Sequence, residues 1–139
     1  MEIFLNNKVG FKVATVDLSD HVTAFTLNRQ ADQLEVTAMG DTSHKFVTGL
    51  SADTITVSFL NDTAAASVLA TLQAAFGTTV AFAAVQDKVA SISATNKLYT
   101  GTILVDNLTD IAGAVADEAM IDITFTCNST TALATTGTW

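Results

Sequence analysis

Apolar and polar residues alternate along most of the chain. The clearest case is 53–60, where Ile55, Val57 and Phe59 take every second position and Thr or Ser lies between them. A period of two predicts a strand that buries one face, because successive side chains of a strand point to opposite sides. The pattern therefore predicts a mainly β fold. Similar alternation, or β-branched residues on both faces, predicts further strands at 11–18, 22–28, 33–38, 79–85, 99–105 and 119–126.

One helix is expected within this β pattern, at about 62–76. Asn61 or Asp62 can accept the first free N–H groups of a helix, and Gly77 can adopt the left-handed conformation that ends one. The segment between them is rich in Ala and has a narrow apolar stripe, which indicates that the helix lies across one face of a sheet. The stripe consists of Val68, Leu69, Leu72, Ala75 and Phe76.

Two segments are not predicted to be regular. The stretch 40–49 links two predicted strands by a connection longer than a tight turn, and such loops are often functional. The last residues, at about 128–139, have no charge and little to bury. They are expected to form a flexible arm that docks on a neighbouring subunit, or else a frayed end. The length predicts a single domain over 1–139.

Composition excludes several classes of protein. The net charge is −8, and the six Lys and Arg residues are scattered singly, so the chain lacks the basic stripe of a DNA or RNA reader. A hydrophobic content of 49% excludes a disordered chain. The start does not resemble a signal peptide, and the uncharged stretch 63–86 is too polar for a membrane span, so no membrane insertion is expected. The single cysteine, Cys127, fits a small buried hydrophobe.

Catalytic and metal-binding patterns are absent from the sequence. It contains no nucleophile elbow, phosphate-binding glycine loop or zinc-protease motif. A catalytic triad would need His21 or His44, and both fit better as solvated turn or interface residues. The cluster of Asp106, Asn107 and Asp110 does not match the spacing of a calcium loop. We therefore expect no enzyme activity, no catalytic residue, no metal and no cofactor.

Strand edges are poorly protected in this sequence. Proteins usually block exposed edges with Pro or Lys, because an open edge pairs with other chains. This chain has no proline, and its lysines fall mainly near predicted strand ends and loops. Unprotected edges favour pairing between subunits, and hence self-assembly.

The order and spacing of several segments resemble the major tail tube proteins of long-tailed bacteriophages. The resemblance covers roughly 15–126, and no single motif in it is catalytic or diagnostic. The matching segments are Asp17-Leu18-Ser19-Asp20-His21-Val22, Leu27-Asn28-Arg29, Glu35-Val36-Thr37-Ala38, Gly40-Asp41-Thr42, Lys45-Phe46-Val47-Thr48-Gly49-Leu50, Phe59-Leu60-Asn61-Asp62, Ser93-Ala94-Thr95-Asn96, Tyr99-Thr100-Gly101 and Gly113-Ala114-Val115.

This resemblance implies a β-sandwich or barrel-like fold with one flanking helix. Six copies would join edge to edge into a ring, and the rings would stack into a hollow tube that conducts genome DNA. Implied partners are further copies of the chain and the tape-measure, tail-tip and tail-terminator proteins; double-stranded DNA passes without specific binding. The implied location is the virion tail, assembled in the cytoplasm of the bacterial host. The candidate inter-ring loop is Gly40, Asp41, Thr42, Ser43, His44, Lys45, Phe46, Val47, Thr48 and Gly49.

An acidic conduit gives the net charge a role. A wall without basic residues does not grip phosphates, and its carboxylates repel DNA over a screening length of about 8–10 Å. The candidate lumen-facing acids are Glu35 and Asp122, each on the polar face of an alternating strand, with Asp53 as a weaker candidate. An ordinary solvated outer face is the alternative for all three.

Other functions fit the sequence less well. A head decoration protein, a head–tail completion protein or a tube subunit of a contractile particle would share much of the pattern. A small β-sandwich that binds a ligand usually presents aromatic platforms. With one Trp and one Tyr, this chain offers few.

Overall fold

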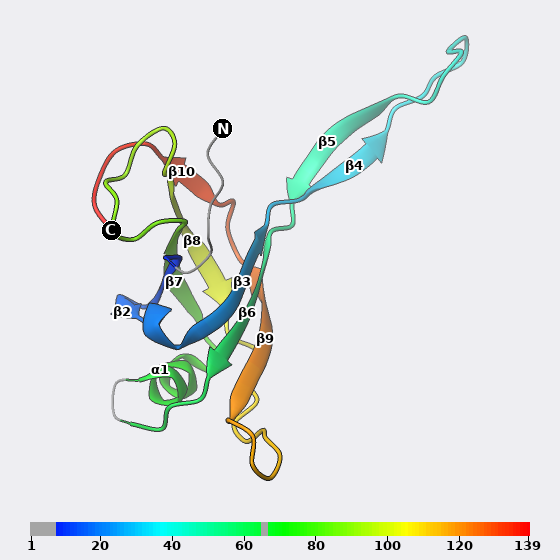
Figure 1. Cartoon of the computed structure of the whole chain (residues 1–139). Helices are drawn as coiled ribbons and strands as arrows, with labels where there is room; N and C mark the ends of the chain where they lie inside the picture. The colour runs from blue at the N-terminus through cyan, green and yellow to red at the C-terminus, as the bar shows by residue number, and fades with distance from the viewer. Residues whose placement is uncertain (1–7, 65–66) are drawn as a thin grey trace.

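The computed structural model describes residues 8–64 and 67–139. Eight strands form one antiparallel sheet in the order β2-β1-β7-β8-β9-β6-β3, with β10 paired to β8, and β4 and β5 form a separate two-stranded sheet (Figure 1). The fold is therefore mainly β, as the alternation predicted. The elements are β1 (Gly10–Val13), β2 (Val16–Asp17), the 3-10 turn η1 (Ser19–His21), β3 (Val22–Asn28), β4 (Ala31–Glu35), β5 (Phe46–Ser51), β6 (Thr54–Leu60), α1 (Val68–Ala75), β7 (Thr79–Val85), β8 (Leu98–Leu104), β9 (Met120–Cys127) and β10 (Ala132–Ala134).

The central strands bury one face, as their alternation predicts. On β6 the side chains of Val57 and Phe59 are fully buried, and they pair across the ladder with Ile123 and Ile121 of β9. Because directly paired residues point to the same side of a sheet, the apolar positions of both strands join one core. The Thr and Ser residues between them face outward.

The sheet curls so that strands near its two ends meet. The ring of Phe11 on β1 lies 5.0 Å from the ring of Phe25 on β3 and 6.2 Å from that of Phe59 on β6, between centroids. β1 and β3 are far apart in the strand order, so these contacts require the sheet to fold over on itself. The core therefore lies between two layers formed by one continuous sheet.

Helix α1 covers one end of this core, and it is shorter than the predicted 62–76. Its N-cap residue is Ser67, and not Asn61 or Asp62 as predicted. The Asp62 carboxylate instead accepts a hydrogen bond from the N–H of Ala64 at 2.9 Å, which forms a separate turn before the helix. Residues 65–66 of the predicted helix lie outside the described residues. Gly77 has a φ of +78°, so the predicted left-handed ending is confirmed. Phe76 was wrongly assigned to the buried stripe: its backbone is not helical, with a φ of −55° and a ψ of 131°, and the residue is 55% exposed.

Leu72 is fully buried in the middle of α1. Replacing it with Ala should lower the free energy of unfolding by about 2–5 kcal/mol, because the cavity left behind closes only in part. Urea unfolding followed by circular dichroism measures the change. Leu69→Ala, on the same helix but only partly buried, is the matched control, and an equal loss in both variants would contradict a core role for Leu72.

Most strand boundaries agree with the alternation to within one residue, and three of the exceptions are small. The predicted strand 11–18 is a hairpin, because Ala14 and Thr15 have positive φ angles and turn the chain between β1 and β2. The predicted strand 33–38 is shifted to Ala31–Glu35. β10 was not predicted.

The predicted loop 40–49 is the largest correction. Its last four residues, Phe46–Gly49, belong to β5, which pairs with β4. The connection between the two strands is 36–45. The strand was missed because its residues are exposed on both faces, so no one-sided burial creates a period of two.

Candidate assembly interface

The hairpin formed by β4 and β5 projects away from the body of the protein (Figure 1). It extends the β3–β6 pair, and every residue of both its strands is exposed except Gly49, which is half-buried. Its two strands and tip expose several large apolar side chains to solvent, which is typical of a surface that another protein covers. These are Leu34, Val36, Met39, Phe46, Val47 and Leu50.

Side-chain contacts hold the tip of the hairpin in one shape. His44 Nδ1 lies 2.6 Å from Glu35 Oε1, and Lys45 Nζ lies 2.5 Å from Asp41 Oδ1. The second carboxylate oxygen of Asp41 accepts the N–H of Ala38 at 2.8 Å. The Lys45 ammonium and this N–H together hold the pKa of Asp41 below its usual range. The tip is therefore a structured loop that presents its apolar residues in a defined direction.

Asp53 holds the root of the hairpin. Its side chain is only 3% exposed, and its two oxygens accept the N–H of Gln30 at 3.1 Å and the N–H of Thr131 at 3.0 Å. Burial alone would raise the pKa of Asp53, but hydrogen bonds from Thr131 and Gln30 and the nearby charge of Arg29 outweigh it, so the pKa is lowered. One carboxylate thus ties the β3–β4 junction to the β9–β10 connection.

The three acids proposed to face a channel lie in different places. The carboxylate of Asp53 is buried and accepts hydrogen bonds from two backbone N–H groups, so it does not face a channel. A channel-facing role stays a proposal for Glu35 and Asp122. Glu35 ends β4 on the hairpin, in contact with His44. Asp122 is exposed on the outer side of β9, where its carboxylate accepts the hydroxyl of Ser58 at 2.5 Å. The structure therefore does not bring Glu35 and Asp122 onto one sheet.

Asp122 belongs to a polar sheet face, here called the threonine face. It is the side of β3, β6 and β9 opposite to the core, and it has one carboxylate and no basic residue. Thr56 and Thr124 meet on it across the ladder, with their hydroxyl oxygens 3.4 Å apart. Its members, taken from the strand register, are Ala24, Thr26, Asn28, Thr54, Thr56, Ser58, Leu60, Met120, Asp122, Thr124 and Thr126.

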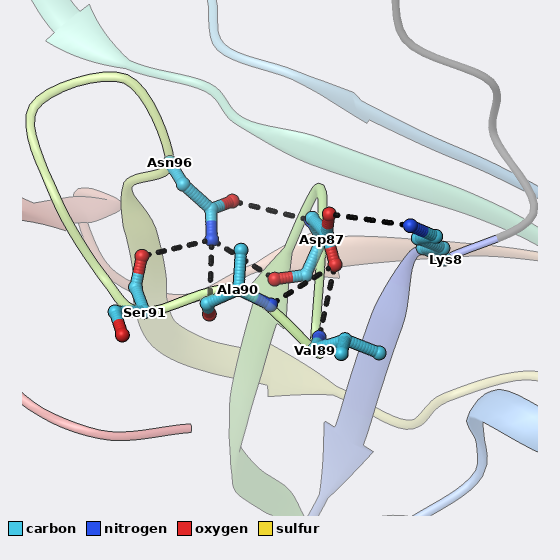
Figure 2. Close-up of polar contacts among 6 residues, drawn as sticks. All are labelled: Lys8, Asp87, Val89, Ala90, Ser91 and Asn96. Carbon is cyan, nitrogen blue, oxygen red and sulfur yellow. Dashed lines mark hydrogen bonds and ion pairs between the residues drawn. The ribbon is translucent and has the colours of Figure 1, made fainter.

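A loop at 86–97 is held by a buried amide (Figure 2). The side-chain nitrogen of Asn96 donates to the carbonyl oxygens of Asp87, Ala90 and Ser91 at 2.9–3.3 Å, and its oxygen accepts the N–H of Asp87 at 3.2 Å. The Asp87 carboxylate lies 4.0 Å from the Lys8 ammonium. Sequence reasoning gave Asn96 no such role, because an Asn in a turn has no pattern that marks it as buried.

The two ends of the described chain meet beside the 86–97 loop. β10 pairs with the first half of β8, and Trp139 then lies against Gly10, where a Cβ atom would come within 2.7 Å of the indole ring. The Lys12 ammonium lies 4.3 Å from the centre of the same ring. The flexible arm at 128–139 and the single domain over 1–139 stay predictions.

Each of the two histidines lies beside one carboxylate. His21 Nε2 lies 3.0 Å from an Asp62 carboxylate oxygen, whereas the hydroxyl of Ser19 donates to Asp17. Over 8–64 and 67–139, no three or more His, Cys, Asp or Glu residues group so as to hold a metal ion. In the same ranges, no helix is both long enough and apolar enough to cross a membrane.

Comparison with solved structures identifies similar folds. A chain from the virion of a native gene transfer agent particle has a TM-score of 0.72 at 13% sequence identity, covering 95% of this chain and 99% of that one. A chain from the tail of an empty gene transfer agent particle, solved with C6 symmetry, has a TM-score of 0.59 at 15% identity, covering 84% and 83%. At these identities the likeness shows the fold. No protein-family model and no curated protein matches the chain.

Proposed function

We propose that this chain is the tail tube subunit of a phage-like particle. Six copies form a ring, the rings stack into a hollow tube, and the tube conducts double-stranded DNA out of the particle into a host. The observation that carries the proposal is the likeness to a chain from a C6-symmetric tail, over 84% of this chain. In this role its partners are further copies of itself and the tape-measure, tail-tip and tail-terminator proteins.

Strand edges support assembly into a ring. Within the described part of the chain, β3 pairs only with β6, so its other edge is free to pair with a neighbouring copy. Joining edges around a closed ring removes every exposed edge, which is the usual solution for a β-protein that does not protect its edges otherwise. The hairpin leaves from the same pair of strands and reaches beyond the body, toward the next ring.

The threonine face is the surface that we propose for the channel wall. The hydroxyl groups of this face carry no positive charge that would attract phosphates, and six copies contribute six Asp122 carboxylates to each ring. A basic residue at this place would contact phosphates and release their counterions, which increases affinity and slows passage. The wall is therefore suited to transport because it does not hold the DNA.

Reversing the charge of Asp122 tests this proposal. Asp122→Lys should leave assembly intact, because the side chain is exposed on β9, while tubes of this variant should retain duplex DNA at low salt. Particles with this subunit should deliver less DNA than particles with the natural one. Retention is measured by filtration of labelled DNA with preformed tubes at increasing salt.

Asp20→Lys is the matched control, because it makes the same charge change on η1, outside the threonine face. Glu35→Lys tests the second candidate acid in the same assay. Equal DNA retention by Asp122→Lys and Asp20→Lys would contradict a channel position for the threonine face.

A further inference from the structure

A groove opens at the root of the hairpin. It has a volume of about 930 Å³ and lies between the ends of β3–β4 and β5–β6 on one side and the β9–β10 connection, 127–130, on the other. Leu50 lines it and is 81% exposed. Arg29 lines it too, and within the described ranges its guanidinium has no carboxylate within 4 Å. The groove thus offers an apolar side chain and a guanidinium that makes no direct ion pair, with the Asp53 carboxylate as the nearby negative charge.

The connection between β8 and β9, residues 105–119, also exposes apolar side chains, but its charges are negative. Ile111 and Val115 are 93% and 100% exposed, which leaves two large apolar side chains without a contact that buries them. The connection has no basic residue, and all four of its carboxylates are exposed: Asp106, Asp110, Asp117 and Glu118.

These two surfaces lie at opposite ends of the same strands. Thr54 pairs with Thr126 beside the groove, and Leu60 pairs with Met120 where the 105–119 connection enters β9. The seven residues of β6 span roughly 20 Å at about 3.3 Å per residue. Figure 1 shows the hairpin leaving one end of the body, and the connection before β9 lying at the other end near α1.

Hydrogen bonds within the chain order both surfaces in the single copy, without a partner. Asp53 holds the two walls of the groove together, and the hydroxyls of Ser51 and Thr130 meet across it at 2.8 Å. In the 105–119 connection, the Asn107 amide donates to the carbonyl of Thr124 at 2.9 Å. Such ordering lowers the entropy lost on binding.

We propose that the 105–119 connection of a second copy of this chain docks in the groove at the hairpin root. Ile111 and Val115 would cover Leu50, and the neighbouring carboxylates would pair with Arg29, whose planar guanidinium suits carboxylate partners. The proposal rests on the proposed function, because it assigns the contact by which one ring stacks on the next.

This contact is heterologous, since two different surfaces meet. Each copy keeps a free groove at one end and a free connection at the other, so addition continues in one direction without limit. The geometry accounts for a stack of indefinite length built from a single kind of subunit.

Two blocked variants test the contact. In the groove-blocked variant, Arg29→Gln and Leu50→Asp alter the groove, add no carboxylate at position 29 beside Asp53, and leave 105–119 intact. In the connection-blocked variant, Ile111→Asp and Val115→Asp alter the connection and leave the groove intact. All four side chains are exposed, so both variants should fold. Each variant alone should stack more weakly than the natural chain, so that the protein concentration needed for tubes rises by at least about tenfold, equivalent to about 1.4 kcal/mol.

The decisive result comes from mixing the two variants. The intact connection of the first fits the intact groove of the second, so the mixture should form a species with equal numbers of both variants, which then stops growing. Native mass spectrometry measures this stoichiometry. Ala81→Asp, on the outward side of β7, adds the same kind of charge outside both surfaces and should stack normally.

The outcomes separate this inference from the proposed function. Absence of the mixed species, or normal stacking by either variant alone, would overturn the docking contact even where six-membered rings form. Conversely, a mixed species made of one chain of each variant would support the contact and contradict the ring. Stacking lost equally in Ala81→Asp would also overturn the inference, because the loss would then not depend on the groove.

Discussion

Replacing the hairpin tip 36–45 with a two-residue Asn-Gly turn should give a folded protein that forms no tubes. Glu35 and Phe46 are directly paired, so a two-residue turn can close the shortened hairpin between them. The replacement removes the exposed side chains of Val36 and Met39 and leaves every core residue in place. The loss of tubes should be complete, because the replacement removes the whole tip that we propose to contact a neighbouring ring.

Electron microscopy shows whether the shortened protein forms tubes, and thermal unfolding shows whether it folds. A control that keeps the length of the arm, Thr42→Ala at the tip, should assemble as the natural chain does. Tubes formed by the shortened protein at the same concentration as the natural chain would contradict a role for the hairpin in assembly.

Removing the Asp53 carboxylate should have the second largest effect. Asp53→Ala leaves the N–H groups of Gln30 and Thr131 without their acceptor, and each such loss in a buried place costs about 1–3 kcal/mol. The free energy of unfolding should therefore fall by about 2–6 kcal/mol, as measured by urea unfolding. Asp20→Ala, which removes an exposed carboxylate, is the control. A change in Asp53→Ala as small as in this control would contradict the role of Asp53 at the root.

Lowering the pH should destabilise the fold through Asp53, as the substitution Asp53→Ala does. Because the pKa of Asp53 is lowered in the folded protein, its ionised form stabilises the fold above the usual Asp pKa of 3.8. That stabilisation is lost as the pH falls from this value through the lowered pKa. The stability of Asp53→Asn, which cannot titrate at this position, should consequently depend less on pH below 4 than that of the natural chain.

The sequence predicted the strands that bury one side. β6 and β9 alternate strictly because the core takes every second side chain, and this burial places Asp122 on the outer face, as the pattern implied. The predictions failed where burial is not one-sided. β5 is exposed on both faces, so nothing in 40–49 distinguished a strand from a loop.

The root of the hairpin could not have been predicted from the pattern. Asp53 precedes an alternating strand and reads as one more polar residue, yet its carboxylate binds the N–H of Thr131, 78 residues further along the chain. The groove could not be predicted for the same reason. Arg29, Leu50 and the β9–β10 connection are far apart in the sequence and come together only when the sheet has formed. Contacts of this range depend on tertiary structure, and local periodicity carries no signal of them.

Negative-stain electron microscopy of the purified natural chain at high concentration tests the central claim most directly. We expect hollow tubes, or six-membered rings seen end-on, with no other protein present. A protein that stays monomeric at every concentration and salt tested, or that forms assemblies without a sixfold axis or a central channel, would contradict it.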